Sequence, residues 1–439
     1  MLINNELSRN QDNIFDNFID ECLINQIAIE TGFLKRQPKK ITPSSFVLGF
    51  IQCCAKSTYS FSQWAIQIGW LIESTVSKQA VFDRINETAV EFIAGLLKHC
   101  LQNKLLDDCK CNIPTPIFSP FGKILLQDST TLNLSQSLAD QFPGNKSKGL
   151  QKAVARVQTI INIKTMQIFQ CTLASFTNND QSASRDILDY LTKGDLVIRD
   201  LGYFVMDAFQ EIIDREAYFV SRLKYGIIVY TKQGDRIDMA ALLKNNKSII
   251  EMDVLINKCK LPVRLVMIKL PDNIANEKVR KAKCDRNIKT NHSLEYYEWC
   301  RYNAYITNVP PAIWTAIQIP EVYKVRWQIE IIFKSWKSGM KMEQMLKGVE
   351  NVHKVRVCIS MMLLFITFFM AKIYMPYKNE VKKQYDKNVS LIKLSTFVMN
   401  NLYALMTTNE CFVLELVAKH CIFEKRNKRI NMTQMINAF

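Results

Sequence analysis

Three consecutive strand-like runs, followed by alternating helices and strands, constrain the fold of this chain more than any other feature. The runs KILLQDSTTLNL, KAVARVQTIINI and MQIFQCTLAS follow one another from residue 123. A helical stretch, SASRDILDYL, then leads into the apolar run DLVIRDLGYF, and a helix over about 205–215 precedes the strand YFVSRLK. Successive strands followed by helix–strand alternation predict an α/β fold with a mixed sheet.

The residues before this sheet, about 14–110, contain long mixed apolar runs that favour helices. Within them, a helix over about 61–71, a polar turn and a second helix with Ser77 as N-cap have helix-turn-helix rhythm. An ordinary helix pair gives the same pattern. If the pair binds DNA, its second helix reads the major groove. The candidate DNA contacts on or near that helix are Lys78, Gln79 and Arg84.

Residues 225–299 are polar and carry short, interrupted strands such as SIIEMDV and LPVRLVMIKL. The buried-strand run AYITNV and a strong helix follow them. The pattern therefore indicates a β-rich insertion into the sheet-forming region rather than a separate domain.

An apolar run, VCISMMLLFITFFMA, extends over 15 residues from Val357 to Ala371 without a charge. A membrane-spanning helix needs about 20 apolar residues, so this run is short for that role. Basic residues on both sides of it would suit a membrane flank. We favour a helix buried in a large core, with a membrane span as the alternative.

The charge balance favours a polyanionic partner. The chain has 57 Lys+Arg against 41 Asp+Glu, a net charge of +16, and cations that neutralise phosphates release condensed counterions. The 13 cysteines form no CxxC pair, and the 4 histidines have no zinc-finger spacing. Reduced thiols and a polar N-terminus predict a cytoplasmic protein.

A polar stripe borders an apolar one on the segment EVYKVRWQIEIIFKSWKSG. The segment is expected to form a helix, on which four polar residues fall within an arc of roughly 60° at about 100° per residue. They are Tyr323, Arg326, Glu330 and Lys337. An amphipathic helix with its polar side in water has the same periodicity. An active-site helix that presents a carboxylate is the other interpretation.

Two aspartates favour the active-site interpretation. Asp128 lies inside ILLQDSTTLNL and Asp200 inside LVIRDLGYF. Burial of a charged carboxylate in an apolar strand is costly unless it is paired or binds a metal. With Glu330 they form a set of hard oxygen ligands suited to Mg²⁺, and two such ions can cleave a phosphodiester.

These residues resemble a known family, the DDE transposases of the bacterial insertion sequence 4 family. The family signature Y-x2-R-x3-E-x6-K is matched in full by Tyr323, Arg326, Glu330 and Lys337. The segments LLQDSTTLNL and IRDLGYF also look like the family's two aspartate motifs. The resemblance extends to about residue 375.

The resemblance implies an RNase H-like catalytic domain with a β-rich insertion, preceded by an all-helical DNA-binding domain. It implies that Asp128, Asp200 and Glu330 bind Mg²⁺, for which Mn²⁺ is expected to substitute. It also implies that Tyr323, Arg326 and Lys337 hold the DNA backbone. The expected divisions are 1–112 (DNA-binding), 113–224 and 300–375 (catalytic), 225–299 (insertion) and 376–439 (C-terminal helices).

The implied function is cut-and-paste transposition by a homodimer that binds the terminal inverted repeats of an insertion sequence, with no membrane partner. A catalytically inactive DNA-binding remnant is the alternative. Whether a DNA hairpin intermediate is used stays open, because Trp299 and Tyr302 match no known base-stacking position, and Trp299 also suits core packing.

Overall fold

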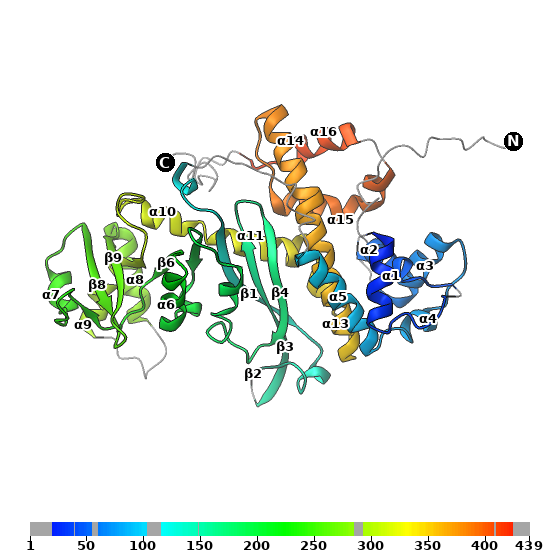
Figure 1. Ribbon diagram of the computed structural model, residues 1–439, viewed down its shortest axis with the longest axis horizontal. Helices are drawn as coiled ribbons and strands as arrows, with labels where there is room; N and C mark the ends of the chain where they lie inside the picture. The colour runs from blue at the N-terminus through cyan, green and yellow to red at the C-terminus, as the bar shows by residue number, and fades with distance from the viewer. Residues whose placement is uncertain are drawn as a thin grey trace.

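The computed structural model of the chain describes residues 20–38, 40–54, 60–102, 116–147, 149–284, 293–407 and 410–424. The molecule is elongated, with the N-terminal helices at one end, a sheet in the middle and the insertion at the other end (Figure 1). The expected boundary between 1–112 and 113–224 lies outside the described residues.

The N-terminal region is helical, as predicted. Its helices are α1 (Glu21–Glu30), α2 (Pro43–Cys54), α3 (Phe61–Ile72), α4 (Lys78–Phe82) and α5 (Glu87–Gln102). Serine side chains cap the helix-turn-helix pair, since Ser60 accepts from the N–H of Gln63 and Ser77 from that of Ala80. The second helix of the pair, α4, is only five residues long.

A mixed 10-stranded sheet follows the N-terminal helices, in the order β2-β3-β1-β5-β6-β10-β9-β8-β7, with β4 also paired to β3. Its strands in the first part of the chain are β1 (Ile124–Asn133), β2 (Pro143–Ser147), β3 (Leu150–Asn162), β4 (Gln167–Ser175), β5 (Leu196–Arg199) and β6 (Tyr218–Arg222). Strand β1 pairs antiparallel with β3 and parallel with β5, so the predicted mixed α/β sheet is confirmed.

Residues 225–299 extend this same sheet. They contain β7 (Val229–Tyr230), α7 (Met239–Lys244), β8 (Ile249–Ile256), β9 (Leu261–Lys269), α8 (Asp272–Lys283) and α9 (Leu294–Trp299). Strand β9 pairs with β10 (Tyr302–Thr307), which in turn pairs with β6. The inserted strands are therefore joined through β10, which follows them in the chain, to β6, which precedes them.

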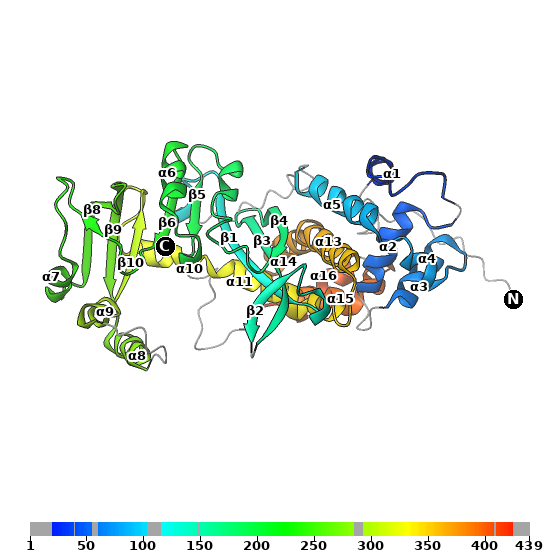
Figure 2. The same cartoon turned by 90° about the horizontal axis from the view of Figure 1, so that it is seen from below.

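The two faces of the sheet pack against different helices. Side chains alternate along a strand, so Leu126 packs into the core that includes α10 (Gln318–Lys324) and α11 (Trp327–Lys334), whereas Leu125 packs with α6 (Met206–Asp214). Two residues beyond Leu126, Asp128 is on the α11 side of the sheet. Figure 2 shows α11 running across the strands on this side.

The apolar run 357–371 is a core helix, as predicted. It lies in α13 (Val352–Phe368), which continues through a π-helical turn, η6 (Phe369–Tyr374), into α14 (Met375–Tyr385). By length and composition the helix Val352–Tyr385 is apolar enough to cross a membrane, but 89% of its most apolar window is buried inside the protein. It packs beside α5, between the sheet and the N-terminal helices (Figure 1).

Helices near the C-terminal end of the segment 321–339 complete this side of the molecule. They are η5 (Ser335–Gly339), which is π-helical, α12 (Met342–Met345), α15 (Leu391–Thr407) and α16 (Glu410–His420). Helix α15 packs directly on η5. At the contact, a Cβ placed on Gly339 would lie 2.0 Å from Oγ of Ser395, so only glycine allows this close approach.

Two helical predictions were wrong in detail. The single helix expected over 321–339 is broken between α10 and α11, where Arg326 and Gln328 donate backbone hydrogen bonds three residues back. The helix expected over 182–191 is a turn followed by a 3-10 helix, η3 (Asp186–Tyr190). There, the carbonyls of Ala183 and Ser184 accept hydrogen bonds from side chains of the sheet, and nearby N–H groups bond three residues back.

Candidate active site

The two aspartates predicted as ligands lie side by side on neighbouring parallel strands. The register pairs Leu126 of β1 with Ile198 of β5. Asp128 and Asp200 each lie two residues further along, so they come opposite one another. Strand β5 ends at Arg199, and the Asp200 carboxylate caps the following 3-10 turn, η4 (Leu201–Tyr203), by accepting from the N–H of Gly202 at 3.3 Å.

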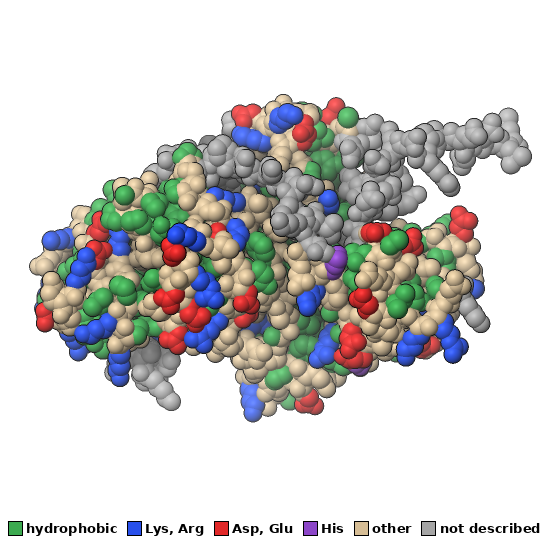
Figure 3. All heavy atoms as spheres, in the orientation of Figure 1, with side chains coloured by type: hydrophobic (Ala, Val, Ile, Leu, Met, Phe, Trp, Pro, Cys, Tyr) green, Lys and Arg blue, Asp and Glu red, His purple; other side chains and the backbone are tan. Residues whose placement is uncertain are grey.

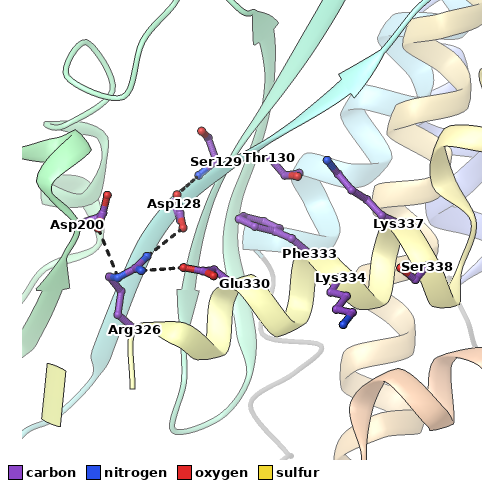
Figure 4. Close-up of a pocket in the computed structure, with 10 residues that line it drawn as sticks. All are labelled: Asp128, Ser129, Thr130, Asp200, Arg326, Glu330, Phe333, Lys334, Lys337 and Ser338. Atoms are coloured by element: carbon purple, nitrogen blue, oxygen red, sulfur yellow. Dashed lines mark hydrogen bonds and ion pairs between the residues drawn. The ribbon is translucent and has the colours of Figure 1, made fainter. Parts of the chain in front are cut away.

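Helix α11 brings Glu330 to the same place, and Arg326 joins all three carboxylates. Nη2 of Arg326 lies 2.7 Å from Oε1 of Glu330. Nη1 lies 3.5 Å from Oδ2 of Asp128, and Nε lies 3.5 Å from Oδ1 of Asp200. Figure 4 shows these contacts as dashed lines converging on one guanidinium. Three elements distant in sequence thus present carboxylates to one point.

Burial changes the acidity of Asp128. Loss of solvent raises the pKa of this carboxyl to about 6, a shift that the backbone N–H of Ser129 and the charge of Arg326 oppose. Burial also lowers the pKa of Arg326, but the neighbouring acidic groups outweigh it and hold the pKa above its ordinary value. Arg326 is therefore a permanent positive charge among the three carboxylates.

The carboxylates line an open pocket of about 440 Å³ that also contains basic side chains. Lys334 and Lys337 line it together with Phe333, all from the segment that carries Glu330. Nζ of Lys337 donates to the carbonyl of Thr131 at 2.6 Å and lies 3.6 Å from Oε1 of Glu343. Three acidic and three basic side chains thus share one pocket, which suits an anionic substrate and cations together.

Comparisons with known proteins agree with this arrangement. The family model described as "Transposase DDE domain" matches residues 119–366, more than half of the chain. The chain belongs to the DDE transposase family. It is a phosphoryl-transfer enzyme family, and the resemblance to the insertion sequence 4 transposases is confirmed.

Curated relatives of this transposase cover most of its length. The chain is 28% identical over 339 residues to the transposase for insertion sequence element IS231B of Bacillus thuringiensis subsp. berliner, covering 72% of this chain and 70% of the relative. It is 26% identical over 348 residues to that for IS1151 of Clostridium perfringens, covering 74% and 72%. A solved piggyBac transposase synaptic complex with hairpin DNA aligns with a TM-score of 0.43 at 9% identity, over 97% of this chain and 88% of that chain.

Tyr323 is the signature residue that does not line the pocket, but it lies close enough to Asp200 and Arg326 for their charges to act on the pKa of its hydroxyl, which burial raises. Its side chain is buried, with its ring edge-on to that of Tyr305 at 5.3 Å between centroids. Its hydroxyl has no hydrogen-bond partner among the described residues. The tight turn between α10 and α11 changes the rotation of Tyr323 relative to Arg326. A contact of Tyr323 with DNA stays a prediction.

The N-terminal candidates lie apart from the pocket. Lys78 and Gln79 are exposed on α4, and Gln79 donates to Asp83 at 2.6 Å. Arg84 is half-buried, just beyond α4, and donates to the carbonyl of Ala80 at 3.2 Å. On the molecular face in Figure 3, basic and acidic side chains of the described residues are interspersed. The charge of +16 therefore does not by itself locate a DNA surface on that face.

Trp299 packs within the insertion, and Tyr302 begins β10, the strand that follows it. The ring of Trp299 lies edge-on to Tyr225 at 5.7 Å between centroids, and the hydroxyl of Tyr302 donates to the carbonyl of Lys247 at 3.1 Å. Core packing is thus the role that the structure gives to Trp299.

Sequence reasoning missed the polar residues around the two aspartates. Asp180, in the connection between β4 and β5, accepts hydrogen bonds from Ser129 and Arg156 at 2.8 and 2.7 Å. Arg199 is fully buried next to Asp200. A charged residue inside the apolar run LVIRD was a usable signal, because a buried guanidinium needs several acceptors. The partners of Asp180 are distant in sequence, so no local pattern points to it.

Proposed function

We propose that this transposase cleaves DNA at the terminal inverted repeats of an insertion sequence and joins the freed ends to target DNA, in a cut-and-paste reaction. The observation that carries the proposal is the convergence of Asp128, Asp200 and Glu330 on one point in a pocket that is also lined by cations. The family match to the transposase DDE domain supports the same reaction class.

The three carboxylates are of the ligand type that a divalent metal takes, although the described residues contain no preformed group of three or more His, Cys, Asp or Glu side chains that could hold one. They supply only oxygen atoms, which Mg²⁺ and Mn²⁺ prefer, and they already surround a cationic group. Two bound ions would activate a water and stabilise the leaving oxygen of a phosphodiester. Asp128, Asp200 and Glu330 are the residues that would hold them. The mixed sheet that carries the two aspartates on neighbouring parallel strands supports the RNase H-like assignment.

Arg326 has two roles in this proposal. In the structure its guanidinium lies between the three carboxylates and neutralises part of their charge. Divalent ions held by Asp128, Asp200 and Glu330 would supply that neutralisation instead, and the guanidinium could then bind a phosphate of the DNA through two parallel hydrogen bonds. Lys337, tied to the backbone of β1, and the exposed Lys334 then hold the DNA backbone beside the cut.

The DNA-end reader is placed in the N-terminal helices, and a homodimer is proposed for the paired ends. A cytoplasmic, nucleoid-associated location accompanies this function.

Removal of each carboxylate in turn tests the function. Asp128→Asn, Asp200→Asn and Glu330→Gln keep the side-chain shape but remove a charge, so each is expected to abolish Mg²⁺-dependent cleavage of end DNA while leaving DNA binding measurable. Robust cleavage by any one variant would remove that residue from the site. Wild-type protein that bound end DNA but never cleaved it, with Mg²⁺ or Mn²⁺, would instead support the inactive remnant.

A further inference from the structure

Four hydrogen-bond donors converge on one carboxylate oxygen that the proposed reaction does not use. Oδ1 of Asp180 accepts from Oγ of Ser129 at 2.8 Å and from Nη1 of Arg156 at 2.7 Å. It also accepts from Nε2 of Gln158 at 3.1 Å and, at 3.3 Å, from the hydroxyl of Tyr203, whose shorter hydrogen bond, at 2.6 Å, goes to Oε1 of Gln158. The donors come from β1, β3 and η4, so Asp180 connects three elements of the catalytic sheet.

Two of these donors are next to the catalytic aspartates. Ser129 directly follows Asp128, and its backbone N–H donates to that carboxylate at 2.8 Å. Tyr203 ends the 3-10 turn that Asp200 caps. Asp180 therefore holds the residue beside one catalytic aspartate and the turn that begins at the other.

The residues that follow Asp180 make a parallel set of contacts. Gln127, which precedes Asp128, donates to the carbonyl of Ala183 at 2.6 Å. Arg199, which precedes Asp200, is fully buried and donates to Gln127 Oε1 at 3.1 Å and to the carbonyl of Ser184. Residues 180–184, called here the Asp180 loop, thus contact both catalytic strands on either side of the two aspartates.

We infer that Asp180 is a positioning residue, which through the Asp180 loop holds Asp128 and Asp200 at the separation that divalent-metal binding requires. The inference rests on the proposed metal role of those two aspartates. Two like-charged carboxylates repel one another, and β5 ends at Arg199, so the sheet hydrogen bonds of β5 stop before Asp200. The hydrogen bonds of Asp180 with Ser129 and Tyr203 fix the distance between Asp128 and Asp200 beyond the end of the strand.

A second aspartate provides a matched control. Asp195 is buried just before the opposite end of β5, where it accepts from the N–H groups of Lys123 and Thr192 at 2.7 and 2.8 Å. Its removal breaks a comparable buried network on the same strand, away from the catalytic aspartates. Asp180→Ala and Asp195→Ala should both lower the melting temperature, but only the first should weaken metal binding.

The test is calorimetric titration of Mn²⁺ into the metal-free full-length protein, without DNA. Asp180→Ala is expected to weaken Mn²⁺ binding by about 10–100-fold, as for other residues that orient metal ligands. Asp180→Asn should recover most of the affinity, because its amide oxygen still accepts the four hydrogen bonds. Tyr203→Phe removes one tie without emptying the core and should give a smaller, measurable loss; it keeps the test decisive if Asp180→Ala does not fold.

Each other result overturns the inference. Wild-type affinity in Asp180→Ala or in Tyr203→Phe would show that the ties do not matter for the metal. An equal loss in Asp195→Ala would indicate general destabilisation, and equal losses in Asp180→Asn and Asp180→Ala would make Asp180 a direct ligand. If the wild-type protein bound no Mn²⁺ at all, both the inference and the proposed metal site would be wrong.

Discussion

Nη2 of Arg326 lies 2.7 Å from Oε1 of Glu330, one helical turn further along α11. The same guanidinium lies 3.5 Å from a carboxylate oxygen of Asp128 and of Asp200, the two aspartates proposed to bind metal. In the structure, Arg326 is therefore the group that keeps three carboxylates together. Arg326 therefore has a structural role, holding the carboxylates together, before any DNA is bound.

Arg326→Lys is expected to slow cleavage, because a single ammonium cannot replace a planar guanidinium that serves three carboxylates and then a phosphate. Loss of one charge-assisted contact in the transition state corresponds to roughly 10–150-fold in rate. Single-turnover cleavage of preassembled complexes measures it. Arg215→Lys is the control, since among the described residues Arg215 forms its one ion pair with Glu211 on the surface, at 3.8 Å, and its exchange should leave the rate unchanged. Equal rates for the two variants would exclude the phosphate role of Arg326.

Replacement of Lys78, Gln79 and Arg84 by alanine is expected to weaken binding of end-repeat DNA and to reduce its selectivity. Two of the three are cations, so the slope of log affinity against log salt should fall by about two units. The full chain is the proper test object, because α5 packs against α13 and an isolated fragment of residues 1–110 would lose that partner. Unchanged affinity and selectivity, measured by gel shift at several salt concentrations, would place the end reader elsewhere.

The metal-free protein should lose stability as pH rises through about 6. Burial raises the pKa of Asp128 to about 6, above the value of about 3.9 expected in the unfolded chain, so the folded state binds this proton more tightly. The resulting stability is fully present below about pH 4 and is lost above about pH 6. Asp128→Asn should therefore be more stable than wild type at pH 8 by roughly 1–3 kcal/mol and equally stable at pH 4. Urea unfolding with a chelator measures both values, and a less stable variant at pH 8 would contradict the expectation.

Gly339→Ala is expected to destabilise the protein by about 1–3 kcal/mol, because the new methyl group would press on Ser395 of α15. Oγ of Ser395 is held by its own helix through a hydrogen bond to the carbonyl of Ile392 at 2.9 Å, so it cannot simply turn away. Ser395→Gly added to Gly339→Ala should recover part of the loss, whereas Ser395→Gly alone should not stabilise. Thermal unfolding of the four proteins completes the cycle, and strictly additive effects would mean that the two residues do not touch.

The local patterns predicted the sheet strands well and the active-site helix less well. The runs around Asp128 and Asp200 are β-strands followed by turns because their apolar residues must be buried on both sides. The segment 321–339 has helical periodicity, yet it contains a tight turn before Arg326 and a π-helical turn after Lys334. Periodicity assigns an arc to each residue only while the helix stays regular, so it did not show that Tyr323 is buried.

The sequence by itself determined the mixed sheet, the buried helix over 357–371 and the choice of Asp128, Asp200 and Glu330. Each depends on residue types that are close together in the sequence. These are the periodicity of apolar residues, the carboxylates whose burial in apolar runs is costly, and the signature Y-x2-R-x3-E-x6-K. Only the tertiary structure decided that Arg326 bridges the three carboxylates, that Tyr323 is buried and that Asp180 connects both catalytic strands. Those contacts join residues that are far apart in the chain. The distances between them are set by strand register and helix packing, which no local sequence pattern encodes.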